Sequence, residues 1–372
     1  MTPIRVPPNI DRIEPYVPGK PIEEVERELG LTNTIKLASN ENPLGPSPRA
    51  LEAISAAIGG VNRYPDGSGY YLKKRLGRIH QLPIEQVLLG NGSTDLVEIL
   101  ARTFLGADGT AVMADQAFIM YRIAVMAVNG NARVVPLRRM RHDLPAMADR
   151  IDSSTRLVFI ANPNNPTGTC VTHREMVEFL DRVPEGTLVV VDEAYKEYVL
   201  EPDYPDTLSL LKQGRRLAIL RTFSKIYGLA GLRLGYAMTT ADVAASAEKV
   251  RSPFNTSSVA QAAGLAALDD QGHVARSREH NERERGFLQT ELSRRGIPFT
   301  PSAANFVLVD TGRDAERVFA LMLGAGVIVR PMRSYNLPTC IRVSVGTHEE
   351  NLLFLSALEL SLASTLSRNA SD

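Results

Sequence analysis

Residues 217–236 read LAILRTFSKIYGLAGLRLGY, and this stretch shows best how the chain folds. It begins with a continuous apolar run, which is typical of a strand buried on both faces of a parallel sheet. Ser224 and Lys225 follow the run, and Arg233 lies eight residues after Lys225. Because ligands bind at the carboxyl ends of the strands in open α/β sheets, the stretch predicts a ligand site around Lys225.

Further apolar runs earlier in the chain have the same form, and each closes into a turn. They occupy residues 86–90, 110–115, 133–137, 156–161 and 187–191. Longer amphipathic stretches with helical spacing separate most of these runs, at residues 93–105, 118–128 and 172–183. The alternation of strand and helix predicts an α/β fold with a large domain around a mostly parallel sheet.

The pattern changes after about residue 255. Two long helical segments precede a few separated apolar runs, which predicts a smaller α+β domain. The proline-rich start of the chain predicts an extended arm that packs between the two domains. We therefore expect an arm and part of the small domain at 1–45, the large domain at 46–255 and the small domain at 256–372.

The composition argues against several classes of function. The 372 residues include 42 basic and 42 acidic side chains, so the excess positive charge of a nucleic-acid-binding protein is missing. No apolar run approaches the roughly 18 residues that cross a bilayer, and the start of the sequence shows no apolar signal-peptide core. Cys170 and Cys340 are too few for a disulfide framework, and the histidines show no metal-ligand spacing. We expect a cytoplasmic protein that binds no metal, membrane or nucleic acid.

Polar residues follow the other predicted strands as well. Gly92 begins a helix together with Ser93 and Thr94, which suits an anion site but also an ordinary capped turn. Asn165 lies in NPNNPTG, where turn chemistry alone explains much of the composition. Asp192 directly follows a buried strand, and such a carboxylate is costly unless a cation meets it. That cation is either a ring N–H⁺ of a cofactor or a structural arginine or lysine.

Two interpretations of Lys225 are possible from the sequence. At the mouth of a strand, with Arg233 nearby, it is a candidate Schiff-base lysine, because desolvation and a neighbouring cation favour its neutral, nucleophilic form. An isolated lysine is more often simply solvated. The order of anion loop, Asn165, Asp192, Lys225 and Arg233 along the chain favours the first reading.

This order and spacing resemble the fold-type-I pyridoxal-phosphate aminotransferases over essentially the whole chain. The most specific local match is SK-x(2)-G-L-x-G-L-R-x-G-Y, supported by NPNNPTG and VVVDEAY. Within that superfamily, four segments are most similar to the histidinol-phosphate aminotransferases: KLASNENPLGPSP, RYPDGSGYYLKKRL, LGNGSTDLVEIL and IRVSVGTHEENLLFLSAL.

The resemblance implies a role for each matching residue. Lys225 would hold pyridoxal 5′-phosphate as an aldimine and would act as general base and acid once it is released. Asp192 would pair with the ring nitrogen, Asn165 and Tyr195 would contact the ring 3′-oxygen, and Phe118 would stack on the ring, although DQA before Phe118 departs from a common family pattern. The groups expected to hold the 5′-phosphate are Gly92, Ser93, Thr94, Thr222, Ser224 and Arg233. Tyr64 would reach the phosphate of the other subunit, which requires a homodimer.

The resemblance also implies substrates. Arg342 would bind the α-carboxylate of glutamate, and Arg330 would bind the phosphate of histidinol phosphate, with Tyr16 and Asn42 nearby. The implied reaction is the ping-pong interconversion of L-histidinol phosphate and 2-oxoglutarate with imidazole acetol phosphate and L-glutamate, in histidine biosynthesis.

Alternatives on the same scaffold are a phenylalanine-type aromatic aminotransferase and a phosphothreonine decarboxylase. A nicotinamide dehydrogenase is disfavoured because no early GxGxxG fingerprint follows a strand. A non-catalytic binding module is disfavoured because Lys225 and Asp192 are both retained.

Overall fold

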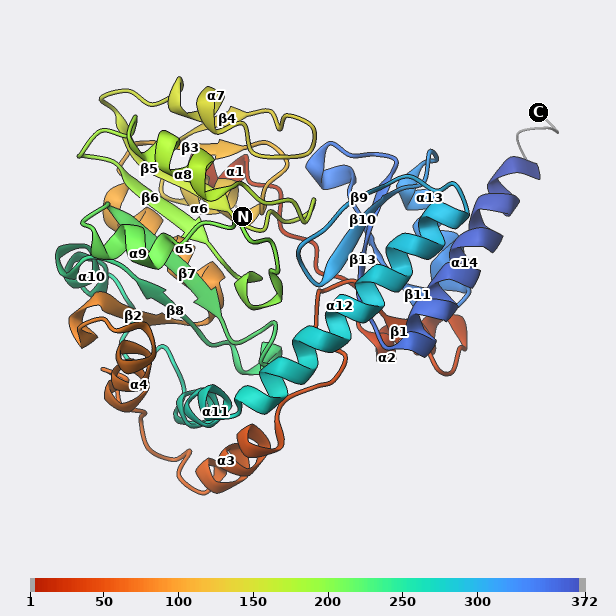
Figure 1. Ribbon diagram of the computed structural model, residues 1–372, viewed down its shortest axis with the longest axis horizontal. Helices are drawn as coiled ribbons and strands as arrows, with labels where there is room; N and C mark the ends of the chain where they lie inside the picture. Colours follow the sequence, from red (N-terminus) through yellow and green to blue (C-terminus); the bar gives the residue numbers. More distant parts are fainter. Residues whose placement is uncertain (1–3, 368–372) are drawn as a thin grey trace.

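A seven-stranded sheet forms the centre of the larger half of the molecule (Figure 1). The computed structural model describes residues 4–367. In spatial order the strands are β2 (Val87–Gly90), β8 (Gly235–Met238), β7 (Leu217–Thr222), β6 (Leu188–Asp192), β5 (Thr155–Ala161), β3 (Thr110–Ala114) and β4 (Asn131–Val135). The apolar runs predicted as strands are confirmed. The last five strands of this order are parallel, whereas β8 runs antiparallel to both of its neighbours. The sheet is therefore mostly parallel.

Both faces of this sheet are buried, which explains its continuous Val, Ile and Leu runs. Alternate residues of a strand point to opposite faces, so Val158 and Ile160 enter one core while Leu157 and Phe159 enter the other. The second core is covered by α5 (Gly92–Phe104), α6 (Met120–Ala127) and α10 (Ala241–Glu248). The first core is covered by α3 (Pro48–Ile58), α4 (Tyr70–His80), α7 (Leu144–Ala148), α8 (His173–Leu180), α9 (Thr207–Lys212) and α11 (Ser258–Asp269).

The smaller half contains a four-stranded antiparallel sheet. Its order is β12 (Arg330–Pro331), β13 (Cys340–Ser344), β10 (Phe306–Asp310) and β9 (Phe299–Thr300). Its core is shared with α12 (Gln271–Arg294), α13 (Ala315–Gly324) and α14 (His348–Ser367). The long helix α12 begins near α11, which packs on α3, and runs to the small sheet (Figure 1).

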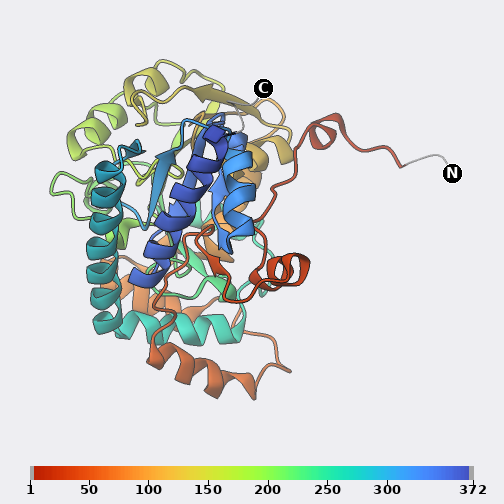
Figure 2. The same ribbon diagram turned by 90° about the vertical axis from the view of Figure 1, so that its right-hand side faces the viewer.

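The N-terminal segment contacts both halves. Helix α1 (Pro8–Asp11) lies against α6, where the Asn9 side chain donates a hydrogen bond to the Met126 carbonyl at 2.9 Å. The chain then crosses to α2 (Ile22–Leu29) and to β1 (Ile35–Lys36), which pairs in parallel with β11 (Val327–Ile328) (Figure 2). The segment is extended between these elements, as its prolines predict, but the prediction did not include helix α2. Among the described helices, none is long and apolar enough to cross a membrane.

Candidate active site

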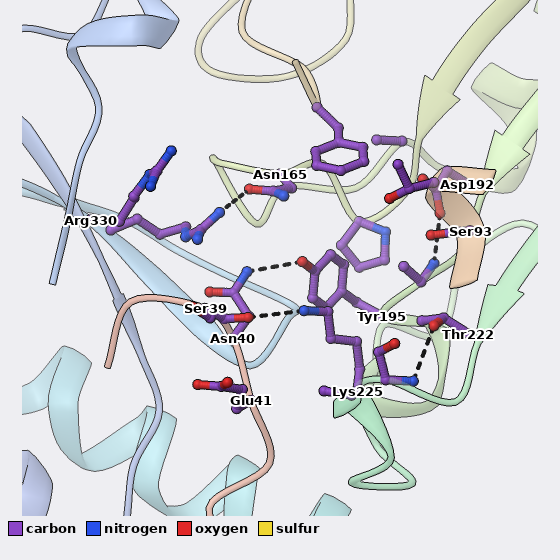
Figure 3. A pocket seen from close by; sticks show the side chains of 18 of the residues that line it. Ser39, Asn40, Glu41, Ser93, Asn165, Asp192, Tyr195, Thr222, Lys225 and Arg330 are labelled. Carbon is purple, nitrogen blue, oxygen red and sulfur yellow. Dashed lines mark hydrogen bonds between the residues drawn. The ribbon is translucent and has the colours of Figure 1, made fainter. Parts of the chain in front are cut away.

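A cavity of about 260 Å³ lies where the carboxyl ends of β5, β6 and β7 face the small sheet (Figure 3). Thirteen of the sequence-predicted residues line it: Tyr16, Ser93, Thr94, Phe118, Asn165, Asp192, Tyr195, Thr222, Ser224, Lys225, Arg233, Arg330 and Arg342. Residues more than 300 positions apart in the chain therefore meet at one place. Three predicted residues, Gly92, Asn42 and Tyr64, do not line the cavity and are described below.

Lys225 follows β7 and enters the cavity from the large half. Its Nζ donates a hydrogen bond to the Ser39 carbonyl at 3.0 Å and lies 5.6 Å from the centre of the Tyr195 ring. Desolvation, together with the positive charge of Arg342, lowers the pKa of Lys225 to about 7. Within residues 4–367, no carboxylate oxygen lies within 4.0 Å of this nitrogen. A large fraction of the amine is therefore neutral near pH 7 and able to act as a base or nucleophile.

A tight turn brings Lys225 to this position. The amide of Gly228 donates to the Lys225 carbonyl at 3.0 Å, and Gly228 has a φ of +67°. A Cβ at Gly228 would lie 2.2 Å from the Gly45 carbonyl oxygen, so only glycine allows this close approach. The turn thus packs the end of β7 against the N-terminal segment that supplies Ser39.

Asp192 ends β6 and is buried, with 5% of its surface exposed. Its Oδ2 accepts a hydrogen bond from the Tyr121 hydroxyl at 2.8 Å, and its Oδ1 accepts one from the Ala194 amide at 3.2 Å. Desolvation raises the pKa of Asp192 to about 6, although these hydrogen bonds oppose the rise. No basic nitrogen lies within 4.0 Å of the carboxylate among the residues described. A buried carboxylate of this kind suits a cationic group of a ligand.

The structural arginine that the sequence left as an alternative is present, but it does not serve Asp192. Arg221 donates to Oε2 of the neighbouring Glu193 through Nε at 3.0 Å and Nη2 at 2.7 Å. Glu193 is fully buried and also accepts a hydrogen bond from Thr207. The pair ties the ends of β6 and β7 together, so Asp192 and Lys225 project from a rigid edge.

The start of α5 forms a cradle of hydrogen-bond donors, of the kind that suits an anion. Within the described residues, no side chain caps the backbone N–H groups of its first turn, where Ser93 and Thr94 add hydroxyls. The Arg233 guanidinium lies across this turn, with Nη1 3.2 Å from Ser224 Oγ and Nη2 3.3 Å from the Asn91 carbonyl. Gly92 has a φ of +81°, and a Cβ there would lie 2.8 Å from Arg233 Nη2. Gly92 therefore supports the cradle by letting Arg233 approach.

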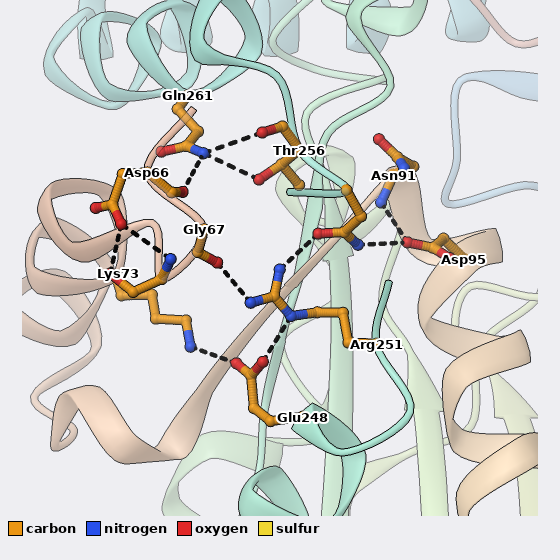
Figure 4. A network of polar contacts seen from close by, with 11 residues as sticks. Asp66, Gly67, Lys73, Asn91, Asp95, Glu248, Arg251, Thr256 and Gln261 are labelled. Carbon is orange, nitrogen blue, oxygen red and sulfur yellow. Dashed lines mark hydrogen bonds and ion pairs between the residues drawn. The ribbon is translucent and has the colours of Figure 1, made fainter. Parts of the chain in front are cut away.

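A polar network behind the cradle holds α5 in place (Figure 4). Asp95 Oδ2 accepts hydrogen bonds from the Asn91 amide at 2.8 Å and from Asn255 Nδ2 at 2.9 Å. Arg251 donates to the Asn255 side chain and, through Nη2 at 2.6 Å, to the Gly67 carbonyl. The network links the first turn of α5 to the loop that precedes α4.

Two arginines of the small half face the cavity. Arg342 Nη1 donates to Asn165 Oδ1, and its Nη2 donates to the Ala38 carbonyl at 2.8 Å. The Nε of Arg342 is buried and has no hydrogen-bond partner in the described part of the chain. Arg330 lies 5.0 Å from the centre of the Tyr16 ring and, like Arg342, has no carboxylate within 4.0 Å among the described residues. Such uncompensated charge suits an anionic ligand.

Two predicted residues point elsewhere. Asn42 donates hydrogen bonds to the Ile226 carbonyl and to Ser277 Oγ, both at 2.9 Å, and thereby joins the N-terminal segment to α12. Tyr64 has 83% of its surface exposed, and its ring stacks on Phe254 with the ring centres 4.7 Å apart. Neither side chain lines the cavity.

The cavity also contains residues that the sequence did not reveal. Asn40 donates to the Tyr195 hydroxyl at 2.9 Å, and Ser39, Glu41, Tyr121 and Tyr335 also line the cavity. Asn40 lies in the same segment as Asn42. The sequence therefore indicated the correct segment but not Asn40 as the residue that lines the cavity. The sequence held a signal for Tyr121, because it lies three residues after Phe118 in the stretch 118–128, whose helical spacing predicts that positions three apart share a side. The helix α6 itself begins at Met120.

Comparisons with known proteins agree with this geometry. Residues 32–358 match the family described as aminotransferase class I and II. The chain is 48% identical over 358 residues to histidinol-phosphate aminotransferase 2 of Pseudomonas fluorescens, with 96% of this chain and 97% of that protein covered. It is 47% identical over 350 residues to histidinol-phosphate aminotransferase 1 of Nitrosococcus oceani, with 94% and 95% covered. The crystal structure of histidinol-phosphate aminotransferase from Sinorhizobium meliloti in complex with pyridoxal-5′-phosphate superposes with a TM-score of 0.88, at 31% identity, covering 97% of this chain and 98% of that one.

Proposed function

The chain belongs to the class I and II aminotransferases, and on that premise we propose that it transfers an amino group between L-histidinol phosphate and 2-oxoglutarate. The products are imidazole acetol phosphate and L-glutamate, and the cofactor is pyridoxal 5′-phosphate. The observation that carries the proposal is the cavity itself. A lysine with a lowered pKa and a buried aspartate face two arginines that have no carboxylate partner among the described residues.

The cavity fits the cofactor at both of its charged ends. The uncapped first turn of α5, with Ser93, Thr94, Ser224 and Arg233, offers N–H, hydroxyl and guanidinium donors to a phosphate. Thr222 lines the same end, but its hydroxyl already donates to the Leu234 carbonyl at 3.3 Å. At the other end, Asp192 offers a buried carboxylate to the ring nitrogen. We propose that these groups hold the cofactor.

When bound, pyridoxal phosphate supplies an aldehyde for amines and a ring that accepts electrons. We propose that Lys225 binds that aldehyde and, once released, moves a proton to and from the substrate Cα. Its pKa of about 7 suits both directions of transfer, because a base works best when its pKa lies near the working pH. The hydrogen bond from Nζ to the carbonyl of Ser39, another residue of the cavity wall, supports this role, because the amine lies at the cavity.

The remaining large-half residues orient the ring. Asn165 accepts a hydrogen bond from Arg342, and the Tyr195 hydroxyl accepts one from Asn40. We propose that Asn165 and Tyr195 both contact the ring 3′-oxygen. Phe118 lines the cavity and is proposed to cover one face of the ring, which requires an aromatic side chain but not the residues before it.

We propose that Arg342 binds the α-carboxylate of glutamate and that Arg330 and Tyr16 bind the phosphate of histidinol phosphate. The Nε of Arg342, which is buried and has no hydrogen-bond partner among the described residues, can donate to such a carboxylate. Arg330 lies beside the Tyr16 ring on the small-sheet side of the cavity, across from Asp192 and Lys225 (Figure 3). Because Asn42 is held away from the cavity, Asn40 is the asparagine of this segment that we place near the substrate.

An absorbance titration of the holoenzyme tests the proposal. L-histidinol phosphate is added in one cuvette and L-phenylalanine in another, and the loss of the yellow cofactor band is followed. Loss at low histidinol phosphate, with phenylalanine required in large excess, supports the proposal. An equal or better response to phenylalanine moves the function to aromatic transamination, and release of carbon dioxide without a keto-acid acceptor moves it to decarboxylation.

Replacing Arg330 by methionine is expected to weaken the response to histidinol phosphate about 10- to 100-fold, because a charge-assisted contact with phosphate is lost. The response to phenylalanine should stay within about twofold, since phenylalanine carries no phosphate. Arg333→Met is the matched control, because Arg333 pairs with Asp314 outside the cavity. Equal losses for both substrates would contradict the role given to Arg330.

We also propose a homodimer in which Tyr64 contacts the cofactor phosphate of the partner subunit. Tyr64 is exposed and outside its own cavity, and Ile58, Val61 and Tyr71 nearby expose 55%, 62% and 73% of their surfaces. Sedimentation velocity should give a dimer, and Tyr64→Phe should raise the Kd for pyridoxal phosphate without dissociating it. A fully active monomer would argue against this arrangement.

A cytoplasmic location is proposed as well, in keeping with the free thiols of Cys170 and Cys340.

A further inference from the structure

Tyr121 is a buried residue of the cavity that has no role in the proposed reaction so far. It lies on α6, and its side chain is fully buried. Its hydroxyl donates a hydrogen bond of 2.8 Å to Oδ2 of Asp192. The residue belongs to a different element from Asp192, so the contact exists only in the folded chain, where α6 packs against β3, β4 and α5.

The Tyr121 ring is held on two sides, which fixes the direction of its hydroxyl. It stacks on Phe159 of β5, with ring centres 4.9 Å apart and planes inclined by 8°. Phe118 meets it edge-on, with ring centres 5.6 Å apart and planes inclined by 88°. Both arrangements are favourable for aromatic pairs. A hydroxyl on a ring clamped in this way has one position, and that position is beside Asp192.

When Asp192 is ionised, the Tyr121 hydroxyl must be the donor of this hydrogen bond. An ionised carboxylate accepts but does not donate, and burial raises the pKa of Tyr121 well above its usual range, so the phenol keeps its proton. The Ala194 amide occupies one acceptor position on Oδ1. Each carboxylate oxygen has a second lone pair, so the carboxylate can still accept a further hydrogen bond from the cavity.

We propose that Tyr121 is a positioning residue that holds the Asp192 carboxylate in one orientation and keeps it anionic toward the cofactor ring nitrogen. The inference rests on the proposed function in one respect, namely that Asp192 faces this nitrogen. The proton between the two groups belongs to the ring as long as the carboxylate is the weaker base. The Tyr121 hydroxyl weakens that base by donating to it.

The groups around Asp192 determine how large this effect is. They are Tyr121 on α6, Glu193 and Tyr195 after β6, and Lys225 after β7. Burial raises the pKa of Asp192, Glu193 raises it further, and the Tyr121 hydroxyl is the strongest influence in the opposite direction. Removing the hydroxyl while keeping the ring should therefore move the proton from the ring nitrogen toward Asp192.

The variant Tyr121→Phe tests this in the holoenzyme reconstituted with ¹⁵N-labelled pyridoxal phosphate. Nuclear magnetic resonance of the labelled nitrogen reports whether it carries a proton. The wild type should show a protonated nitrogen near pH 7, and Tyr121→Phe should show a signal shifted toward the unprotonated form. An unchanged nitrogen signal in Tyr121→Phe would overturn the inference.

Two further variants separate the possible causes. Phe159→Leu loosens the ring but keeps the hydroxyl, so its nitrogen signal should shift clearly less than that of Tyr121→Phe. If Phe159→Leu shifts the signal as much as Tyr121→Phe, packing rather than the hydroxyl is responsible and the inference fails. Asp192→Asn should shift the signal most. If it leaves the signal unchanged, the proposed place of Asp192 is wrong, and that failure is distinct from a failure confined to Tyr121→Phe.

Kinetics give an independent result. Tyr121→Phe should lower kcat about tenfold near pH 7 while KM for histidinol phosphate stays within about twofold, because the lost contact stabilises the reacting ring and not substrate binding. A rise in KM with an unchanged kcat would show that Tyr121 acts on substrate binding, and would contradict its role as a positioning residue for Asp192.

Discussion

Replacing Lys225 by alanine is expected to remove the covalent attachment of the cofactor and nearly all turnover. Loss of the general base alone costs about 10²–10⁴-fold, and loss of the attachment adds to that. The amine is suited to this role because desolvation lowers the pKa of Lys225 to about 7, so the neutral form needed for proton abstraction is abundant above that pH. As the pH falls through 7, the ammonium form predominates and the base is lost.

The measurement combines single-turnover kinetics with the absorbance spectrum of purified protein after addition of pyridoxal phosphate. Lys196→Ala is the matched control, since Lys196 lies over the Tyr204 ring at 4.3 Å and does not line the cavity. The control should keep the spectrum and most of the turnover. Substantial turnover in the Lys225→Ala protein would disprove the assignment of Lys225.

Replacing Asp192 by asparagine is expected to lower kcat/KM about 10²–10³-fold, as is typical when one buried electrostatic partner of the reacting group is removed. Asparagine has nearly the same shape but no negative charge, so it can no longer keep a proton on the ring nitrogen. The packing at the end of β6 should remain, because the amide oxygen can still accept from the Ala194 N–H and the amide nitrogen can donate to the Tyr121 hydroxyl.

The effect of Asp192→Asn on kcat/KM should depend on pH. The pKa of Asp192 is raised to about 6, so the wild-type carboxylate is ionised above that pH and becomes neutral below it. The difference in kcat/KM between wild type and Asp192→Asn should therefore be largest above pH 6 and should narrow only at lower pH, because a ring cation facing the carboxylate lowers the pKa of Asp192 below this value. Asp115→Asn, an acidic residue outside the cavity that contacts Gln116, is the control. A difference that is constant with pH would contradict the role of the Asp192 charge.

Much of the fold was predictable because its determinants are local. Strands buried on both faces must be continuously apolar, so runs such as residues 156–161 and 187–191 indicated their strands directly. The antiparallel strand β8 was not expected, because whether a strand runs parallel or antiparallel depends on its neighbours and not on its own residues. Only the assembled sheet shows that β8 lies between β2 and β7.

The site divides in the same way. Lys225, Asp192, Asn165 and the start of α5 follow strands of one sheet, and the carboxyl ends of parallel strands share an edge, so their proximity could be inferred from the sequence. Arg330 and Arg342 were found by resemblance, and the structure places both on the small sheet facing that edge.

Other features depended on packing between distant elements. The sequence contained an asparagine at both 40 and 42, but only the path of the N-terminal segment decides that Asn40 meets Tyr195 while Asn42 meets α12. The sequence also contained two neighbouring carboxylates, Asp192 and Glu193. Because neighbouring side chains at the end of β6 point to opposite faces of the sheet, Arg221 pairs with Glu193 and not with Asp192.

The sequence by itself thus determined the fold class, because apolar periodicity is a property of short segments. Its motifs, through their resemblance to known proteins, indicated the family and the candidate reactive groups. The tertiary structure alone decided which of those groups are desolvated, which charges remain unpaired, and that Tyr121 lies beside Asp192. Burial and pairing depend on side chains that are distant along the chain. The lowered pKa of Lys225 and the raised pKa of Asp192 therefore arise only when the elements pack together.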